Sequence, residues 1–367
     1  MKTSKTKRII ISVTNDLVGD NRVHKVCTTL TNMGFSILLV GRKLPGSQPV
    51  NRIYQTKRFS LLFKKGACFY AEYNFRLFLF LLFSKTDVLL ANDLDSLTAN
   101  FLASKFKNRP LVYDSHEYFT EVPELINRPR VQKFWEWIEK RTVPELKHAY
   151  TVCESIAKIY NEKYGVQFKV VRNIPLTNNN SLNKISDKDN GEKIILYQGA
   201  VNIGRGLQQA ILAMHHVNGA KLIIAGSGDI KSQLEELVQK ENLKTIVEFT
   251  GRLSIEQLSE LTPRADLGLS IEEDLGLNYR YALPNKLFDY IHAQVPVLVT
   301  NLPEMAAIVK KYRVGTITGS LEPKELAQSI NNALNDESER KVWKKNLKTA
   351  AAELTWEKEE KVIEEIF

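Results

Sequence analysis

The chain has few cysteines and no long apolar run. Its 367 residues include three cysteines, Cys27, Cys68 and Cys153, which are far apart and form no Cys-x-x-Cys pair. They argue against a disulfide framework and against a zinc site, and they fit a reducing cytoplasm. The longest apolar run, residues 77–83, is far shorter than the ~20 residues that a membrane-spanning helix needs. We therefore expect a cytoplasmic protein without a transmembrane segment.

Acidic residues are scarce in the first part of the chain. Residues 1–110 hold 18 Lys and Arg against six Asp and Glu, a net charge of +12, whereas the whole chain carries +9 and the remainder therefore −3. This asymmetry favours an anionic partner for the N-terminal part, such as nucleic acid, an anionic membrane or a phosphorylated substrate. Because no known nucleic-acid-binding module occurs, we expect no nucleic-acid partner.

The remaining composition is ordinary for a globular protein, with 43% hydrophobic and 25% charged residues. Short apolar runs alternate with helical patterns such as residues 22–33 and 94–106. Alternation of this kind predicts βαβ units and parallel sheets, and therefore an α/β fold. The expected strands are residues 8–13, 36–40, 87–91, 111–113, 149–153 and 168–171, and then 193–197, 221–225, 246–249, 265–270 and 295–300.

A polar stretch divides this alternation into two halves. Residues 173–192 are rich in Asn, Ser, Asp and Lys and poor in large apolar side chains, which is typical of a linker. We expect Rossmann-like domains at residues 1–172 and 193–335, followed by C-terminal helices at residues 336–367 that pack back across the domains. Doubly wound domains bind ligands at the carboxyl ends of their strands, so we expect the ligand in the cleft between the domains.

The most informative stretch is residues 281–303, YALPNKLFDYIHAQVPVLVTNLP, which predicts a loop, a helix, a turn and a buried strand. Asn285 and Lys286 lie in the first helical turn, and Asp289 follows one turn later on the same face. The helix N-terminus and Lys286 attract phosphate, while a carboxylate can accept hydrogen bonds from ribose hydroxyls. The spacing thus suits a nucleoside diphosphate, although a local ion pair that caps the helix gives the same pattern.

Other candidate residues follow expected strands in the C-terminal half. Gly199 ends a strand shortly before Arg205 and an expected helix, and Gly226, Gly251 and Arg252 follow later strands. Glycines at strand ends let the backbone approach a ligand, but they also serve turn geometry alone. A solvated Arg205 at a helix end is the corresponding alternative.

In the N-terminal half, His116 follows the strand at residues 111–113, where it could hydrogen-bond a substrate hydroxyl or be an ordinary satisfied polar group. Gly19 lies after the first strand, beside Asp20, which can also cap the next helix. Asp93 and Asp95 form an Asp-x-Asp pair that on its own resembles a metal-binding motif. Two tandem sheets instead favour a strand end without a metal, so we expect neither a metal nor another cofactor.

Together these stretches resemble the retaining glycosyltransferases of family 4, which have the GT-B fold of two Rossmann-like domains. Residues 281–303 are similar to their donor-binding E-x7-E signature, with Asp289 in place of the second Glu and Tyr281 in place of the first. We assign the role of the first Glu to the acidic loop 272–274, and within it to Glu273. The resemblance implies catalytic roles for His116, Arg205 and Lys286, and nucleotide-sugar binding by Gly19, Gly199, Gly226, Gly251, Arg252, Glu273, Asn285 and Asp289.

The resemblance implies that a sugar moves from a UDP- or GDP-linked donor to a glycan or lipid-linked acceptor, with retention of the anomeric configuration. Arg205 and Lys286 would neutralise the leaving diphosphate, and no protein nucleophile would be needed. Two alternatives stay open, because Tyr281 and Ala200 depart from the family pattern. One is an inactive nucleotide-sugar or glycan-binding protein, and the other is a nucleotide-sugar epimerase on the same fold.

Residues 57–85, KRFSLLFKKGACFYAEYNFRLFLFLLFSK, interleave basic and aromatic residues around a single acid, Glu72. Such a mixture predicts a segment that lies in the interface of an anionic membrane, which would place the protein peripherally on the inner face of the cell membrane. Because residues 77–83 are apolar all round, we expect part of the segment to be a core helix, with residues 59–73 as the exposed part.

Overall fold

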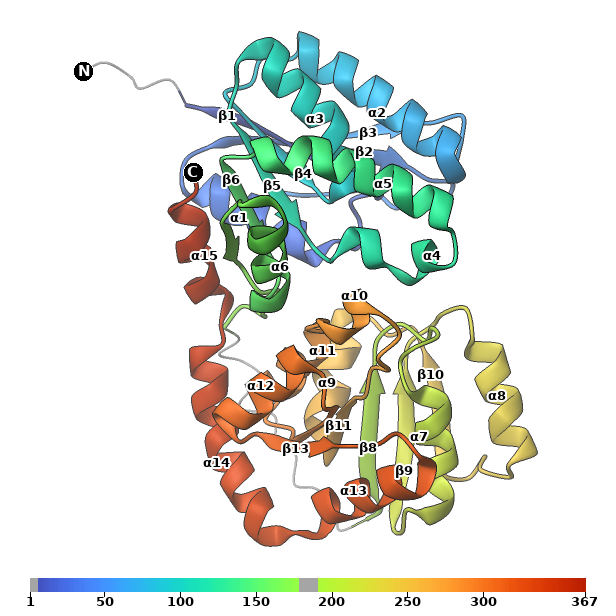
Figure 1. The fold of residues 1–367 in the computed structure, drawn as a ribbon. Helices are drawn as coiled ribbons and strands as arrows, with labels where there is room; N and C mark the ends of the chain where they lie inside the picture. Colours follow the sequence, from blue (N-terminus) through green and yellow to red (C-terminus); the bar gives the residue numbers. More distant parts are fainter. Residues whose placement is uncertain (1–5, 178–190) are drawn as a thin grey trace. The chain divides into compact units, whose positions relative to one another are not determined.

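The computed structural model describes residues 6–177 and 191–367, so residues 178–190 of the expected linker lie outside the described part. The chain divides into two compact units. Unit 1 comprises Met1–Asn173 with Glu359–Phe367, and unit 2 comprises Ile174–Lys358. Each unit is built around one parallel sheet flanked by helices (Figure 1), which confirms the predicted α/β class.

In the described part of unit 1, seven strands run parallel in the order β3-β2-β1-β4-β5-β6-β7. Strand β1 lies between β2 and β4, and its residues Ile9, Ile10 and Ile11 are fully buried because helices cover both faces of the sheet. The strands are β1 (Arg8–Ser12), β2 (Ser36–Lys43), β3 (Gln55–Ser60), β4 (Val88–Asn92), β5 (Leu111–Ser115), β6 (His148–Thr151) and β7 (Phe168–Val170).

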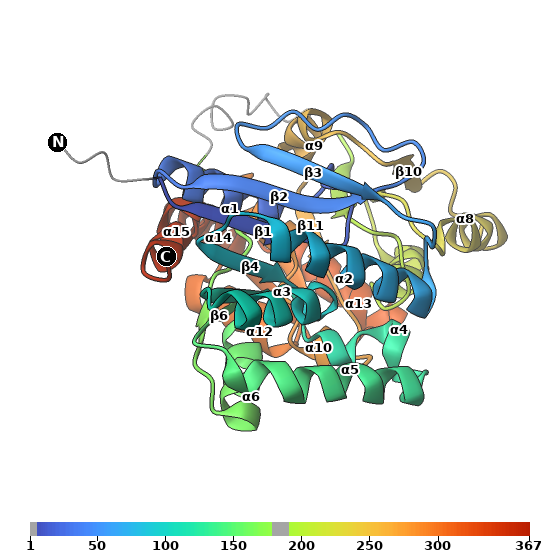
Figure 2. The ribbon, with the colours of Figure 1, turned by 90° about the horizontal axis from the view of Figure 1, so that it is seen from above.

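Helices α2, α3 and α5 form a contiguous layer on the sheet of unit 1, as Figures 1 and 2 show. The C-terminal helix α15 instead packs on α1, where Glu360 accepts a hydrogen bond from Thr29 at 3.0 Å. The helices of four or more residues in this unit are α1 (Asn21–Asn32), α2 (Gly66–Phe83), α3 (Leu94–Lys107), α4 (Pro123–Ile126), α5 (Pro129–Thr142) and α6 (Glu154–Tyr164), together with α15 (Trp356–Glu364) from Glu359 on.

Residues 57–85 form the end of β3, a connection and helix α2. Phe69, Tyr73, Leu77 and Leu81, at four-residue spacing, are the buried face of α2. The expectation that residues 59–73 are the exposed part is therefore wrong for Phe69 and Tyr73. The connection is held to the helix by Glu72, whose carboxylate accepts hydrogen bonds from two backbone N–H groups. The large apolar side chains that stay exposed in this segment are Leu62, Phe63, Phe75, Leu79 and Phe83.

Helix α5 has an exposed apolar stripe that the sequence patterns did not reveal. Val131, Phe134 and Trp137 follow each other at three-residue spacing, and the two aromatic side chains are more than half exposed. Their rings stack on each other with centroids 6.3 Å apart. Four exposed cations of the same helix surround them. We call the α5 outer face the set Arg130, Val131, Lys133, Phe134, Trp137, Lys140 and Arg141.

Among the described residues of unit 2, six parallel strands form a sheet in the order β10-β9-β8-β11-β12-β13. They are β8 (Lys193–Gln198), β9 (Ala220–Ala225), β10 (Val247–Gly251), β11 (Leu267–Ser270), β12 (Val297–Thr300) and β13 (Gly315–Thr318). The helices of four or more residues are α7 (Leu207–Ala213), α8 (Lys231–Lys240), α9 (Ile255–Leu261), α10 (Leu277–Arg280), α11 (Asn285–His292), α12 (Pro303–Tyr312), α13 (Pro323–Asn335) and α14 (Glu337–Glu353).

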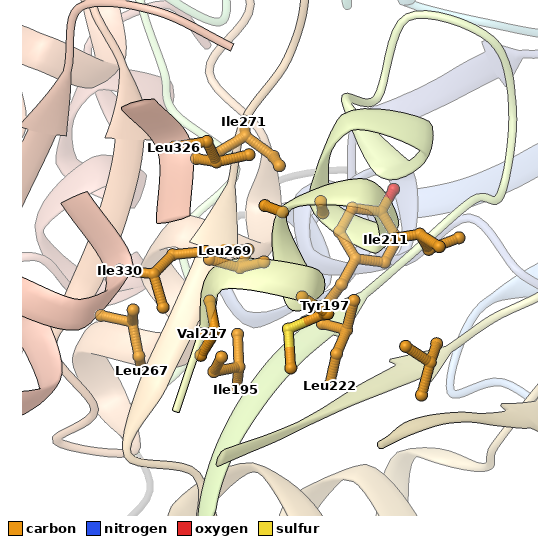
Figure 3. Close-up of a cluster of buried hydrophobic side chains, with 14 of the residues drawn as sticks. Ile195, Tyr197, Ile211, Val217, Leu222, Leu267, Leu269, Ile271, Leu326 and Ile330 are labelled. Atoms are coloured by element: carbon orange, nitrogen blue, oxygen red, sulfur yellow. The ribbon is translucent and has the colours of Figure 1, made fainter. Parts of the chain in front are cut away.

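The core of unit 2 has two layers because side chains alternate along each strand. Ile195 and Tyr197 of β8 point into the layer beneath α7 and α13, shown in Figure 3, whereas Leu196 belongs to the layer formed with α11 and α12. Strand order reverses at β8, which pairs with β9 on one side and β11 on the other. The carboxyl ends of β8 and β11 are therefore the place where a doubly wound sheet binds its ligand.

Candidate functional site

Two of the predicted phosphate ligands meet on one buried carboxylate at the carboxyl end of β11. Glu272 is fully buried, and its Oε1 lies 2.7 Å from Nζ of Lys286 and 3.4 Å from Nη1 of Arg205. Its Oε2 accepts a hydrogen bond of 2.9 Å from Ser270. Burial alone would raise the pKa of Glu272, but Lys286 and Arg205 hold it below its usual value, so the side chain is a carboxylate.

The two cations keep unused donors. Lys286 is 7% exposed, and its ammonium lies 4.0 Å from the ring centroid of Tyr197. An ammonium has three N–H groups, and in the described part of the chain its one ion-pair partner is Glu272. Nε of Arg205 is buried without an acceptor among the same residues. Buried donors of this kind are normally satisfied, so the cluster suits an anionic ligand.

Asp289 is held one helical turn from Lys286 on α11. The side-chain amide of Gln198 donates to Asp289 at 3.0 Å, and the oxygen of the same amide accepts a hydrogen bond of 2.8 Å from Thr262. This fixes the orientation of the Gln198 amide and leaves the half-buried carboxylate of Asp289 beside the end of β8. Asn285, the first residue of α11, is exposed.

Tyr290 packs against Gly268 where β8 pairs with β11. The hydroxyl of Tyr290 accepts from the backbone N–H of Gln198 and donates to the carbonyl of Leu196, both at 3.0 Å. The hydroxyl thus bonds backbone groups of β8 that a neighbouring strand would otherwise pair with. A Cβ at Gly268 would lie 2.5 Å from the ring of Tyr290, so glycine is required there. The sequence patterns singled out neither residue, because a Tyr in a helix resembles any core side chain.

Glu273, the predicted counterpart of the first family glutamate, contacts the turn before α7 instead of Lys286. Its backbone N–H donates to the carbonyl of Gly204, and its carboxylate accepts from the backbone N–H of Gly206 at 3.4 Å. Gly206 has φ +66°, and a Cβ there would lie 2.3 Å from the carbonyl oxygen of Ile271. The acidic loop therefore fixes the turn that carries Arg205, with Glu272 as its buried anchor.

Two of the remaining predicted donor glycines, Gly199 and Gly226, pack against each other. A Cβ on Gly226 would lie 1.8 Å from the carbonyl oxygen of Gly199, so the turns after β8 and β9 approach backbone to backbone. Gly251, with φ +72°, ends β10, and Arg252 is exposed beside it. Gly199 and Gly226 therefore shape the end of the sheet at which the cation cluster lies.

In unit 1, His116 follows β5 and lies between two carboxylates. Its Nδ1 is 3.2 Å from Oδ2 of Asp93, and its Nε2 is 3.0 Å from Oδ2 of Asp114. Burial alone would lower the pKa of His116, but these carboxylates raise it to about 10, so the ring is an imidazolium at neutral pH. Because both ring nitrogens already face carboxylates, His116 can donate to a substrate only by giving up one of them.

Asp114 also binds Arg22 through two hydrogen bonds, of 2.7 and 3.1 Å, and both side chains are almost fully buried. Burial opposes its ionisation, yet Arg22 and His116 lower the pKa of Asp114 to about 2. For Asp93, burial is the largest effect and raises the pKa to about 7. Asp93 is a non-glycine residue at φ +57°, a strained conformation that functional sites often hold.

Two aspartates accept hydrogen bonds from the segment that follows β1. Asp20 accepts a hydrogen bond of 3.0 Å from the backbone N–H of Val23 and is the N-cap of α1, as its position in the sequence allowed. Gly19 is exposed immediately before it. Asp95 accepts from Thr14 at 2.6 Å, and burial raises the pKa of Asp95 to about 6.

Within residues 6–177 and 191–367, no helix is long and apolar enough to cross a membrane. In the same residues no group of three or more His, Cys, Asp or Glu side chains is arranged to hold a metal ion. Metal independence stays a prediction that an activity measurement has to test.

Two protein-family models match the chain. The model described as "Glycosyltransferase Family 4" matches residues 20–176, and the model described as "Glycosyl transferases group 1" matches residues 178–350. The chain is 29% identical over 150 residues to an uncharacterized glycosyltransferase, MJ1607, of Methanocaldococcus jannaschii, which is 40% of this chain and 36% of that relative. It is 30% identical over 127 residues to the chitobiosyldiphosphodolichol beta-mannosyltransferase of Candida albicans, 32% of this chain and 26% of the relative.

The chain thus matches about a third or less of the length of these curated relatives. Solved structures match over nearly the whole chain. Sucrose-phosphate synthase from Thermosynechococcus elongatus has a TM-score of 0.76 at 16% identity, with 98% of both chains covered. Anabaena Alr3699/HepE, solved in complex with UDP-glucose, has a TM-score of 0.73 at 14% identity, again with 98% of both chains covered. At such identities the likeness shows a shared fold.

Proposed function

The chain belongs to the family 4 and group 1 glycosyltransferases with the GT-B fold, and we propose that it moves a sugar from a nucleoside-diphosphate sugar onto a glycan or lipid-linked acceptor. The observation that carries this proposal is the cluster of Arg205 and Lys286 around Glu272. One carboxylate balances one of two cations, which leaves a net charge of +1 and unused N–H donors at the ligand-binding end of the sheet. A diphosphate supplies the missing charge and acceptors.

The donor binds to unit 2 in this proposal. Lys286 lies in the first turn of α11, where the helix N-terminus also favours an anion. Asp289, oriented by Gln198 one turn further on, accepts hydrogen bonds from the ribose hydroxyls. The complex of HepE with UDP-glucose supports a nucleotide-sugar donor for this fold, and either a UDP- or a GDP-linked sugar suits the cluster.

In the proposed reaction, negative charge develops on the leaving diphosphate. When the bond between the anomeric carbon and the diphosphate breaks, the electron pair leaves with the diphosphate, and Arg205 and Lys286 stabilise that charge. The acceptor oxygen forms its new bond to the anomeric carbon on the face from which the diphosphate leaves, and a diphosphate oxygen takes the proton of the acceptor hydroxyl. The protein therefore supplies no nucleophile, and the anomeric configuration is retained. Proton NMR of the product tests retention, and activity in excess EDTA tests metal independence.

The acceptor binds to unit 1, at the carboxyl ends of β4 and β5. His116 contributes a fixed positive charge there, because Asp93 and Asp114 keep it protonated. Asp93, at 23% exposure, is more accessible than the fully buried Asp114, so it is the carboxylate that an acceptor hydroxyl can reach. The Asp93–His116 pair thus orients the acceptor.

A lipid-linked acceptor requires contact with a membrane surface, and the α5 outer face fits one. It combines two exposed aromatic rings and an exposed valine with four cations. Interfacial surfaces need this combination, because the apolar side chains enter the headgroup boundary while the cations meet anionic lipid. We assign this face to an anionic membrane, which would place the protein on the cytoplasmic leaflet.

Calorimetric titration with UDP and GDP tests the proposal. We expect Lys286→Gln and Asp289→Ala each to weaken binding about tenfold to a hundredfold, since a hydrogen bond to a charged group contributes ~1.5–3 kcal/mol. Lys324→Gln is the matched control, because Lys324 is an exposed lysine in the first turn of α13. Equal affinity of both site variants and the control would exclude this donor site.

A further inference from the structure

A second basic feature of unit 2 lies on α14, labelled at the lower left of Figure 1. Between Arg340 and Lys348 this helix carries five cations and no acidic residue. Arg340, Lys344 and Lys348 follow each other at four-residue spacing and therefore lie on one face. Like charges at this spacing repel one another, so the row destabilises the helix as long as nothing neutralises it.

This face of α14 borders a cavity of about 450 Å³. Arg340, Lys344, Lys345 and Lys348 line it on one side, and small apolar side chains, among them Ala265 and Ala293, line the other. Its size falls within the range of roughly 300–1,000 Å³ that is usual for small-molecule sites. As far as the structure describes the chain, no carboxylate lines the cavity.

The cations of the cavity differ in how they are held. The guanidinium of Arg340 donates to the backbone carbonyls of Asp266 and Ala333, at 3.1 and 3.0 Å, and lies 3.6 Å from the Asp266 carboxylate. The Arg340 side chain is therefore held in place where it lines the cavity. The side chains of Lys344, Lys345 and Lys348 are exposed and make no hydrogen bond or ion pair with the described residues. Three ammonium groups are thus available to one ligand.

We propose that this cavity binds a small organic anion whose phosphate carries at least two negative charges. Lysine ammonium groups bind phosphate oxygens as point charges, and the apolar wall suits the carbon part of the ligand. Ala265 and Pro296 precede β11 and β12, whereas Glu272 follows β11 at its other end. In a parallel sheet the amino ends and the carboxyl ends of the strands lie on opposite sides. This site is therefore separate from the proposed donor site and does not rest on the proposed function.

Calorimetry with inorganic pyrophosphate tests the proposal, in a Lys286→Gln background so that the donor site contributes little. We expect the triple variant Lys344→Gln, Lys345→Gln, Lys348→Gln to bind pyrophosphate at least tenfold more weakly than a charge-matched control. The control, Lys240→Gln, Lys244→Gln, Lys310→Gln, removes three exposed lysines of unit 2 that lie outside the cavity. Equal binding by the two variants would overturn the assignment of pyrophosphate to this cavity.

A phospholipid headgroup offers the same phosphate chemistry as a soluble ligand. Sedimentation with vesicles that contain phosphatidic acid separates the two sources. If the triple variant matches the control with pyrophosphate but sediments less than the control, the ligand is a headgroup and the cavity still binds phosphate. If the two variants also sediment equally, the cavity has no phosphate ligand and the proposal fails. Loss of nucleotide binding by Lys286→Gln bears on the donor site alone.

Discussion

The imidazole Nδ1 of His116 lies 3.2 Å from Oδ2 of Asp93, and the backbone N–H of His116 donates to Oδ1 of the same carboxylate at 2.8 Å. The carboxylate of Asp93 thus contacts both the imidazole ring and the backbone N–H of His116, the residue that follows β5. Asp93 adopts a left-handed conformation that costs free energy, and these two contacts help to hold it there. The pair is therefore part of the fold of unit 1 as well as of its site.

This double role predicts that His116→Ala loses stability as well as turnover. The substitution leaves Asp93 without its cation and Asp114 with Arg22 alone, so we expect the free energy of unfolding to fall by about 2–3 kcal/mol at pH 7. Urea denaturation measures this loss. Transfer per folded molecule should fall as well, and normal turnover at reduced stability would show a purely structural residue.

The contribution of His116 depends on pH in a definite direction. Its pKa is raised from 6.5 to about 10, so the stabilisation is complete below pH 6.5 and is lost as the pH rises through about 10. The difference in free energy of unfolding between the wild type and His116→Gln should therefore shrink steadily between pH 6 and pH 10. A difference that stays constant over this range would mean that the imidazole is neutral.

Asp114 predicts the opposite trend at low pH. Its pKa is lowered from 3.8 to about 2, so its stabilisation is present above pH 3.8 and is lost as the pH falls through about 2. Asp114→Asn should cost about 3 kcal/mol at pH 7, because Arg22 stays buried without its counter-ion. The control is Asp274→Asn, whose exposed pair with Arg280 should contribute much less to stability, because solvent screens it. Equal losses in the two variants would contradict a buried ion pair.

Glu272→Gln tests whether the cation cluster is a ligand site. Without the carboxylate, Lys286 and Arg205 lie together uncompensated, so the ligand-free protein should lose about 3 kcal/mol. A bound nucleoside diphosphate restores a counter-charge, and ligands stabilise the folded state by mass action. Saturating UDP or GDP should therefore raise the Tm of this variant by more than it raises that of the wild type. An equal or smaller rise would show that the diphosphate does not contact these cations.

The sequence predicted the central strands and missed two at the sheet edges. Every expected strand is present, with its ends shifted by a few residues, but β3 and β13 were not predicted. Each is an outermost strand of its sheet, and no residue of β3, which reads QTKRFS, is buried. Edge strands pair on one side only and need not be apolar, so hydrophobic patterning does not reveal them.

The sequence predicted only part of the candidate site, because local patterns reveal neighbours within one helix but not contacts between distant segments. Spacing along one helix placed Lys286 and Asp289 together, and both lie on α11 as expected. The contact of Arg205 with Lys286 through Glu272 joins a turn, a strand end and a helix that are far apart in the sequence, which no local pattern encodes. Glu273 was chosen because adjacent acids look alike in sequence, whereas burial distinguishes them: Glu272 is fully buried and Glu273 is partly exposed.

The α5 outer face predicts reversible binding to anionic vesicles. Phe134 and Trp137 are 54% and 56% exposed, and Trp137 provides a fluorescence signal within the face itself. Burying one large apolar side chain contributes about 1.5–3 kcal/mol, so Phe134→Ser with Trp137→Ser should weaken vesicle binding at least about tenfold. The matched control is Ile203→Ser with Ile255→Ser, two apolar residues of unit 2 that are each 68% exposed.

Flotation with phosphatidylglycerol vesicles at low salt measures the binding, and nucleotide titration checks that the donor site is intact. We expect the emission of the wild type to shift to shorter wavelengths on vesicle addition, because Trp137 enters a less polar environment. Raising the salt concentration should weaken binding, since each cation near the surface contributes ~1 kcal/mol through screened attraction. If the wild type does not float, or if the two double variants float equally well, the α5 outer face is not a membrane surface, and a soluble acceptor becomes the better hypothesis.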